Sequence, residues 1–226
     1  MKAILDLTSC STKQISQTAI WHELPKERFV NMQKEMVDIL DSKGKLTGVV
    51  KPKDEAHSSK LWHRSVHVWI YNSKGEVLIQ KRAAMKKSGP GKWDISAAGH
   101  VSSGEKTKES ALRELEEEIG IKADPRNLKH VITTKRSMDI KDIKFYEREF
   151  CYVYLLKHEK LPTKLQREEV AAVKFIPIEK FSDDIKSKKT KAKYVQHPKS
   201  YYLSIIRLIK KELKKRSKAA NKNTNL

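Results

Sequence analysis

Residues 99–121 read GHVSSGEKTKESALRELEEEIGI, and this stretch decides how the rest of the chain is interpreted. Its apolar residues recur at spacings of three and four from Ala111 to Ile119, which predicts an amphipathic helix over residues 105–119. Gly120 follows directly, at the position where a helix commonly ends on a left-handed glycine. The stretch also holds six glutamates in a chain of formal net charge +20, so this local excess of negative charge needs an explanation.

On a helix, three of these glutamates share one face. Glu114, Glu117 and Glu118 stand at i, i+3 and i+4, so their carboxylates converge. Like charges at this spacing repel each other, and Mg²⁺ or Mn²⁺ would relieve the repulsion because these cations prefer oxygen ligands and bridge to substrate phosphates. An acidic run by itself is more often an exposed helix face that forms salt bridges. The spacing of the surrounding residues decides between the two interpretations.

The stretch fits the pattern G-x5-E-x7-R-E-U-x-E-E-x-G-U, in which U is a bulky aliphatic residue, at every fixed position. Ordinary residue frequencies make a chance match rarer than roughly one in a million per window. The segment therefore resembles the loop–helix–loop motif of the Nudix superfamily, with a predicted strand before it and a glycine after its helix. The matching residues are Gly99, Glu105, Arg113, Glu114, Leu115, Glu117, Glu118, Gly120 and Ile121.

The resemblance implies an α+β fold, the Nudix α/β/α sandwich with a mixed sheet, and cleavage of a diphosphate linked to another moiety. It also implies Mg²⁺ or Mn²⁺ as the cofactor, held by Glu114, Glu117 and Glu118. In-line attack of water at phosphorus needs a metal to acidify the water and to neutralise charge on the leaving phosphate. It needs a carboxylate base as well, for which Glu114 or Glu118 is the best candidate in the motif.

Other residues have supporting roles in this interpretation. Arg113 belongs to the catalytic group, and together with Glu105 it is expected to orient the helix rather than to react. Glu168 and Glu169, just before a late predicted strand, resemble the downstream glutamates that some family members use as the general base.

Outside the motif, the chain resembles the type I isopentenyl-diphosphate isomerase branch of the superfamily, over roughly residues 37–180. The resemblance lies in residues 56–100, from AHSSKLWHRS to SAAGH, and in EREFC at residues 147–151. It implies a second divalent-metal site of three histidines and two glutamates, and two basic residues that bind the substrate diphosphate. Matched position by position, the ligands are His57, His63, His100, Glu147 and Glu149, and the diphosphate-binding residues are Arg82 and Lys86.

The spacing of these residues agrees with such a site. Glu147 and Glu149 alternate onto one face of a strand, and His100 immediately follows the first glycine of the motif. The other histidines are expected to be surface or hydrogen-bonded polar residues, and Cys151 to be a buried, inert thiol. Those histidines are His67, His130, His158 and His197.

Ala98 is the main departure from the isomerase pattern. The isomerase's catalytic cysteine immediately precedes the Gly-His pair, and the alanine found here cannot transfer a proton. The isomerases also carry an eroded motif, whereas Glu114 and Glu117 are both present in this chain. The segment between His57 and His63 is one residue shorter than the isomerase pattern. The chain thus has the parts for hydrolysis and lacks a part for isomerisation.

The flanking sequence predicts further strands and helices from alternating apolar residues, turn residues and helical spacings. The expected strands lie at 36–50 (two short strands), 66–79 (a hairpin), 130–134, 144–156 and 169–177. The expected helices lie at 178–187 and 201–213. The resulting division of the chain is an N-terminal extension at 1–36, a Nudix domain at 37–184, a basic helical extension at 185–213 and a disordered lysine-rich tail at 214–226.

Positive charge is concentrated near the C-terminus. Residues 185–226 contain 14 Lys and Arg against one Glu, which accounts for +13 of the net charge of +20. A solvated, lysine-rich extension is the simpler interpretation. The alternative is an electrostatic site for RNA, for an anionic membrane surface or for a phosphorylated substrate, and the charge alone does not choose among them.

Other features bear on the compartment. No apolar run approaches the length needed to span a bilayer, and the first residues do not resemble a secretory signal. Two cysteines are too few for a disulfide framework, so a reducing compartment is expected, the cytoplasm or alternatively the nucleus.

Three functions follow from these observations. The first is an Mg²⁺- or Mn²⁺-dependent Nudix hydrolase acting on a small nucleotide or another organic diphosphate. The second is an isopentenyl-diphosphate isomerase that uses another acid in place of Ala98. The third is an RNA-directed Nudix protein, which removes RNA caps or binds RNA through the basic tail. The sequence leaves the identity of the diphosphate and the oligomeric state open.

Overall fold

The chain forms strands in its first part, with helices between some of them, and ends in three helices. A computed structural model describes residues 35–187 and 190–223, with side chains as far as Lys215. In chain order the elements are β1 (Met36–Leu40), β2 (Leu46–Pro52), α1 (Lys53–Ser58), β3 (His63–Tyr71), β4 (Glu76–Arg82), β5 (Trp93–Asp94), β6 (Ala97–His100), α2 (Thr107–Ile119), the 3-10 turn η3 (Pro125–Asn127), β7 (Leu128–Ile140), the 3-10 turn η4 (Lys141–Ile143), β8 (Phe145–Lys157), β9 (Val170–Pro177), α3 (Ile178–Lys186), α4 (Thr190–Lys193) and α5 (Lys199–Asn223).

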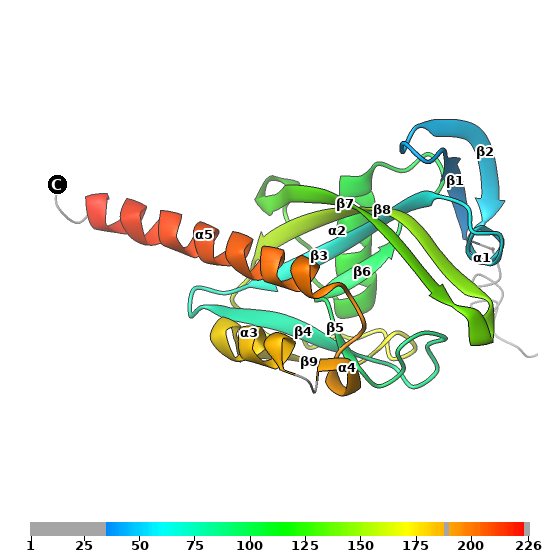
Figure 1. Ribbon diagram of the computed structural model, residues 1–226. Helices are drawn as coiled ribbons and strands as arrows, with labels where there is room; N and C mark the ends of the chain where they lie inside the picture. The colour runs from blue at the N-terminus through cyan, green and yellow to red at the C-terminus, as the bar shows by residue number, and fades with distance from the viewer. Residues whose placement is uncertain (1–34, 188–189, 224–226) are drawn as a thin grey trace, which may run out of the picture. The chain divides into compact units, whose positions relative to one another are not determined.

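Seven strands form one mixed sheet (Figure 1). The order is β5-β4-β3-β8-β7, with β6 also paired to β3 and β9 to β4. Strands β3 and β8 run parallel, from the pair His63–Glu149 to the pair Tyr71–Lys157. The other pairings in the sheet are antiparallel. A parallel pair needs a long crossover connection, and residues 72–144, which include α2, provide it.

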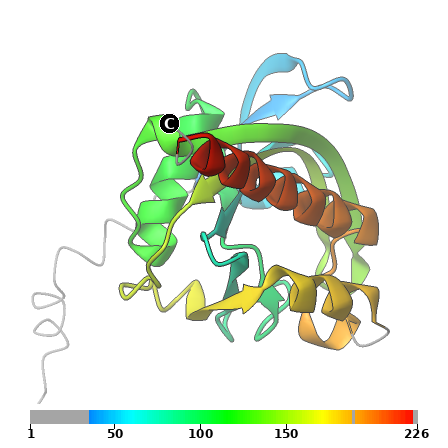
Figure 2. The same ribbon diagram turned by 90° about the vertical axis from the view of Figure 1, so that its left-hand side faces the viewer.

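Helices cover both faces of this sheet (Figures 1 and 2). On one face, Leu115 and other apolar residues of α2 pack against Val66 and Val68 of β3. On the other face, α3 and α5 pack against Trp69 of β3 and its neighbours on β8. The alternating side chains of β3 are therefore buried on both sides of the strand. This arrangement confirms the expected α/β/α sandwich with a mixed sheet.

Helix α2 forms for the reasons that the sequence indicates. Its buried residues follow the expected stripe along one face, from Ala111 to Ile119. It ends at Gly120, which has a φ of 69° and whose amide donates to the carbonyl of Glu116 at 3.0 Å. A left-handed residue at this position favours glycine. The chain therefore turns sharply after the acidic residues and returns towards the sheet.

Helix α5 belongs to the core. Tyr202, Ile205 and Ile209 are at most 1% exposed, in the layer over the sheet face that α3 also covers. The tail expected to be disordered from residue 214 is instead helical through Asn223, because lysine, arginine and alanine are good helix formers and continue the helix already nucleated by packing. The extension expected at residues 1–36 lies almost entirely outside the described residues.

Helix α1 is the main element that sequence spacing did not predict. It has only six residues and lies between the β1–β2 hairpin and β3. The expected strands at 36–50, 66–79 and 169–177 are present as β1 with β2, β3 with β4, and β9. Within residues 35–187 and 190–223, no helix is both long enough and apolar enough to cross a membrane.

Candidate active site

The two buried glutamates of the α2 motif lie against the backbone of the adjacent residues Ala98 and Gly99. Glu114 and Glu118 are only 8% and 5% exposed, respectively. A Cβ atom on Gly99 would stand 2.1 Å from Cδ of Glu114, so only glycine leaves room for this carboxylate. The first glycine of the motif thus fixes where one of its glutamates can lie.

Glu118 is surrounded by hydrogen-bond donors. Its Oε2 accepts from the Ala98 amide at 3.1 Å and from Nε2 of Gln80 at 3.3 Å. Burial raises the pKa of the Glu118 carboxyl to about 8, and the charge of Glu114 adds to the shift. Burial also raises the pKa of Glu114, although the Arg113 guanidinium is 2.7 Å away and opposes the shift. Two buried carboxyls that oppose each other's ionisation form a site that a divalent cation would stabilise.

Arg113 ties α2 to the loop before it. Its Nη1 donates to Glu114 at 2.7 Å and to Glu117 at 3.0 Å. Its Nη2 donates to the carbonyl of His100 at 3.0 Å, and its Nε donates to Glu105 at 3.2 Å. The Glu117 side chain is 53% exposed, so it lies at the surface, unlike the two buried glutamates. Arg113 is therefore placed to orient the helix and its carboxylates.

Three histidines and a glutamate gather beside the motif. The potential ligand atoms of His57, His63, His100 and Glu149 all lie within 4.8 Å of one another. Nε2 of His57 is 3.1 Å from Nε2 of His100, and Oε1 of Glu149 is 3.5 Å from Nε2 of His100. The four residues come from α1, β3, β6 and β8, which lie far apart in the sequence. Among the described residues, this is the group of three or more ligand-type side chains that converges on one point.

The histidine rings are oriented for coordination. Nδ1 of His57 lies 3.1 Å from the Tyr146 carbonyl, and Nδ1 of His63 lies 2.9 Å from the Leu61 carbonyl, which directs each Nε2 towards the cluster. Nε2 of His63 is buried and has no hydrogen-bond partner within the described part of the chain. Burial, with the neighbouring His100, lowers the pKa of His57 to about 4 and also lowers the pKa of His63. Both imidazoles are therefore neutral near pH 7, which is the form that binds metals.

Arg136 of β7 contacts the two glutamates of β8 at different distances and so gives them different environments. Its Nη2 donates to Oε2 of Glu147 at 2.8 Å, and its Nη1 is 3.8 Å from Oε2 of Glu149. Burial and the charge of Glu149 raise the pKa of Glu147 to about 7. Burial also opposes ionisation of Glu149, but its contact with His100 and the charge of Arg136 hold its pKa well below the usual range. Glu149 therefore belongs to the histidine cluster as an anion, whereas Glu147 pairs with Arg136 outside it.

Further polar residues connect this arginine to the C-terminal helix. Nη1 of Arg136 is 2.9 Å from Nε2 of His67, and Nδ1 of His67 is 2.6 Å from the hydroxyl of Tyr201. Nε1 of Trp69 also donates to that hydroxyl at 3.0 Å. His67 is thus a hydrogen-bonded core residue, as expected. The sequence carries no signal for the rest of this network, because it depends on the pairing of β7 with β8 and on the packing of α5.

The two basic residues expected at the substrate diphosphate have different surroundings. Nε of Arg82 donates to the Ser88 carbonyl at 2.9 Å and its Nη1 donates to Asp94 at 3.2 Å, so Arg82 holds the loop after β4. Lys86 forms an ion pair with Glu169, and the charge of Lys86 opposes the rise in the pKa of Glu118. Lys86 therefore lies beside the buried carboxylates, whereas Arg82 is engaged with its own loop.

Three other residues singled out from the sequence are Glu168, Glu169 and Cys151. Glu168 is exposed, whereas its neighbour Glu169 reaches the site through Lys86. Cys151 is fully buried, and burial raises the pKa of its thiol to about 12. The thiol is therefore protonated and unreactive near neutral pH.

Comparison with known proteins identifies the fold and the motif. A model of the NUDIX domain matches residues 61–197, which is more than half of the chain. The chain belongs to the Nudix family. The match begins just before the first histidine of β3 and ends just before α5, so it includes the α2 motif and three residues of the histidine–glutamate cluster.

This Nudix chain has several curated relatives. It is 41% identical over 155 residues to Nudix hydrolase 3 of Arabidopsis thaliana, a match that covers 66% of this chain but only 20% of that protein. It is 36% identical over 156 residues to an uncharacterized Nudix hydrolase of Clostridium acetobutylicum, covering 67% and 74% of the two chains. It is 34% identical over 124 residues to the isopentenyl-diphosphate Delta-isomerase of Escherichia coli O1:K1 / APEC, covering 54% and 66%. The resemblance to both branches of the family is thereby confirmed.

Among solved structures, DR0079 from Deinococcus radiodurans shares the fold. The TM-score is 0.55 at 20% identity, covering 78% of this chain and 98% of that one. This likeness supports the Nudix architecture and carries no information on the substrate.

Proposed function

We propose that this chain is a divalent-metal-dependent Nudix hydrolase that cleaves a diphosphate linkage in a small nucleotide or another organic diphosphate. The observation that carries the proposal is the pair of buried carboxyls on α2, of which Glu114 lies against Gly99 and Glu118 accepts from the Ala98 amide. Burying two acids side by side is costly unless a cation neutralises them. An intact motif with both acids directed inward therefore favours a hydrolytic site.

The residues present fit two cation sites. Glu114, Glu117 and Glu118 would hold Mg²⁺ or Mn²⁺ at the first, because these cations select carboxylate oxygens; the exposed Glu117 shares the Arg113 guanidinium with Glu114. At the second, His57, His63 and His100 face the ionised Glu149 carboxylate, and the buried Nε2 of His63, which has no hydrogen-bond partner among the described residues, is free to coordinate a cation. Metal bound at these places supplies a more acidic water and charge neutralisation at the phosphates.

The chain's own residues account for the remaining requirements. Once ionised, Glu114 or Glu118 is placed to accept the proton of the attacking water, since both carboxyls face the same interior site. Arg113 fixes the orientation of α2 through its bonds to Glu105 and to the His100 carbonyl. Lys86 lies beside the carboxylates and can exchange its partner Glu169 for a substrate phosphate. Hydrolysis at this site yields phosphate or a monophosphate.

The isomerase remains the second candidate because the histidine–glutamate cluster matches that branch. Ala98 argues against it, since its side chain has no proton to transfer. His67 is the cross-strand neighbour of Ala98, and both of its ring nitrogens are bonded, to Tyr201 and to Arg136. Incubation with isopentenyl diphosphate and analysis for the dimethylallyl isomer tests this candidate directly. Formation of that product at a rate above hydrolysis would reverse the ranking.

A panel of diphosphates with Mg²⁺ or Mn²⁺, scored for release of phosphate and monophosphate, tests the hydrolase proposal. We expect Glu118→Gln to lower kcat by about 100-fold or more, since it removes a buried carboxylate from the site. The matched control is Glu116→Gln, because Glu116 is on the same helix but is exposed and paired with Lys122. If Glu118→Gln retains the turnover of the control, the site assigned here is wrong.

A further inference from the structure

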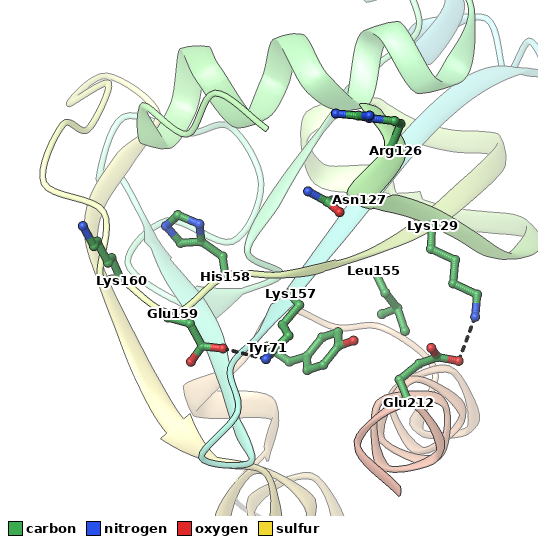
Figure 3. Close-up of a pocket in the computed structure, with 10 residues that line it drawn as sticks. All are labelled: Tyr71, Arg126, Asn127, Lys129, Leu155, Lys157, His158, Glu159, Lys160 and Glu212. Carbon is green, nitrogen blue, oxygen red and sulfur yellow. Dashed lines mark hydrogen bonds and ion pairs between the residues drawn. The ribbon is translucent and has the colours of Figure 1, made fainter. Parts of the chain in front are cut away.

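A pocket far from the candidate active site opens at the other end of the parallel strands β3 and β8 (Figure 3). Its volume is about 660 Å³, which is within the range of about 300–1,000 Å³ typical of ligand sites. Strand β8 runs from Glu149, in the histidine cluster, to Lys157, on the pocket wall. At about 3.3 Å per residue, this places the pocket roughly 26 Å from the cluster. It is therefore a separate feature of the molecule.

The walls of this pocket are basic. Arg126 comes from η3, Lys129 from β7, and Lys157 and Lys160 from the end of β8 and the following loop. Four cationic side chains face two carboxylates, so the pocket carries a net positive charge. Figure 3 shows Arg126 and Lys160 on opposite sides of the opening. This arrangement suits an anion that enters between them.

The basic groups are held by ion pairs that an anionic ligand can replace. Lys129 bonds to Glu212 at 2.8 Å and Lys157 bonds to Glu159 at 3.0 Å, as the dashed lines in Figure 3 show. Arg126 bonds outside the pocket, to Asp124 at 2.6 Å, and is 89% exposed. In each of the two lysine pairs one partner is about half exposed, and surface ion pairs contribute only about 0–1 kcal/mol each. Exchanging them for phosphate contacts is therefore inexpensive.

Helix α5 extends the positive charge away from the pocket. Glu212 on the pocket wall is the single acidic residue of this helix, and Lys215, one turn further on, lies 3.4 Å from it. The helix continues to Asn223, and residues 213–223 contain five lysines and arginines and no acid. A basic pocket beside a helix with a lysine- and arginine-rich sequence matches a ligand with several phosphates in sequence better than it matches a single anion.

The surroundings favour a nucleic-acid strand over a membrane surface. The apolar side chains of α5 from Tyr201 to Leu213 are already packed in the core, so this part of the helix presents no apolar face to insert into lipid. The pocket is concave and contains Asn127 and His158, whose side chains can bond to the edge of a base. Proteins that bind single strands combine cations along the backbone with side chains that stack on, or hydrogen-bond to, unpaired bases.

We propose that this pocket and the adjoining turns of α5 bind single-stranded nucleic acid, with a base in the pocket and the following phosphates on the lysines and arginines around it. The proposal goes beyond diphosphate hydrolysis, because it concerns a different end of the sheet and does not depend on the metal sites. It also gives a role to the lysines and arginines of α5, which are part of the positive charge that the sequence concentrates near the C-terminus.

Fluorescence anisotropy of labelled oligo(U) and oligo(dT) with the full chain tests the proposal. The double variant Lys157→Glu with Lys160→Glu inverts two pocket charges. Its control is Lys43→Glu with Lys45→Glu, which changes the net charge equally at the exposed β1–β2 turn. At about 0.1 M salt we expect the pocket variant to bind at least tenfold more weakly and the control to stay within about twofold. The slope of log Kd against log salt should fall by about 1.4 in the pocket variant, for two lost phosphate contacts on a single strand.

Equal weakening in both double variants would overturn the proposal, because it would show that net charge and not this pocket governs binding. Absence of binding by the native chain, or binding to phosphatidylserine vesicles in preference to both oligonucleotides, would also overturn it. Circular dichroism checks that both variants fold. The anisotropy measurement needs no turnover, so its failure is distinguishable from a failure of the proposed hydrolase activity, which both double variants should retain.

Discussion

Replacing Gly99 by alanine should displace the Glu114 carboxylate while changing the stability of the fold only a little. The added Cβ would stand 2.1 Å from Cδ and from Oε1 of Glu114. Carbon atoms in contact lie about 3.5–4.0 Å apart, so the carboxylate must move by at least about 1.4 Å. Because the displaced atoms are the end of a flexible side chain, we expect a loss of stability of only about 1–2 kcal/mol.

The effect on catalysis should be much larger than the effect on stability. A shift of about 1 Å at a reacting group costs roughly 100-fold in rate, and a displacement of this size is forced here. We therefore expect Gly99→Ala to lower kcat by about 100-fold or more for the best diphosphate substrate under saturating metal. Steady-state kinetics with Mg²⁺ and with Mn²⁺, together with urea unfolding, measures both effects.

Gly75→Ala is the matched control. Gly75 has a φ of 77°, and a Cβ on it would meet nothing within 4 Å, so the substitution strains the backbone of the β3–β4 turn by about 1 kcal/mol without touching the site. This variant should lose comparable stability and keep its kcat. If Gly99→Ala also keeps the native kcat, Glu114 does not act from the position seen in the structure, and the reasoning fails.

Three further predictions concern buried groups. In the metal-free folded protein Glu118 keeps its proton up to about pH 8, whereas in the unfolded chain this carboxyl loses its proton near pH 4.5. Between these two pH values the folded state binds more protons than the unfolded state. The free energy of unfolding should therefore fall by up to about 1.4 kcal/mol per pH unit as pH rises. Urea unfolding in EDTA at several pH values measures this fall, and a Glu118→Gln variant with an equally steep fall would contradict it. In a Cys10→Ser background, Cys151 should react with iodoacetamide at pH 8 about 10³-fold more slowly in the folded than in the unfolded protein, because burial raises the pKa of its thiol to about 12. Similar rates in the two states would show that the thiol is accessible. Ile205→Ala should lower the free energy of unfolding by about 2–4 kcal/mol and the exposed Leu161→Ala by less than about 0.5, and chemical denaturation giving equal losses would mean that α5 is not part of the core.

The sequence was most informative where local spacing determines structure. The stripe from Ala111 to Ile119 and the glycine after it predict α2 within two residues at its start, because both features depend on neighbours along the chain. The same spacing predicts that Glu114, Glu117 and Glu118 share a face. It does not predict which of them is buried, since that depends on how far α2 is rotated against the sheet and on the hydrogen bonds of Arg113.

Contacts between distant segments were less accessible from the sequence. The alternation of Glu147 and Glu149 correctly indicates one strand face, but Arg136 pairs with Glu147 and leaves only Glu149 in the histidine cluster. The position of Arg136 follows from the register of β7 against β8. Arg82 matches a substrate-binding position, yet it bonds to the loop after β4. Short helix α1, which carries His57, has too few residues for a periodic signal, so only the structure shows how this histidine joins the cluster.

The parallel pairing of β3 with β8 also has a consequence for the order of folding. Cross-strand partners such as His63 and Glu149 are more than 80 residues apart along the chain, so their pairing closes a large loop before any ladder bond forms between them. Such non-local pairing is slow compared with the formation of α2 or of the β7–β8 hairpin. The histidine cluster lies across this pairing, so it is assembled late in refolding, after the local elements. A spectroscopic signal from Co²⁺ bound at the cluster should therefore lag behind the recovery of helical circular dichroism when the denatured chain is diluted into buffer.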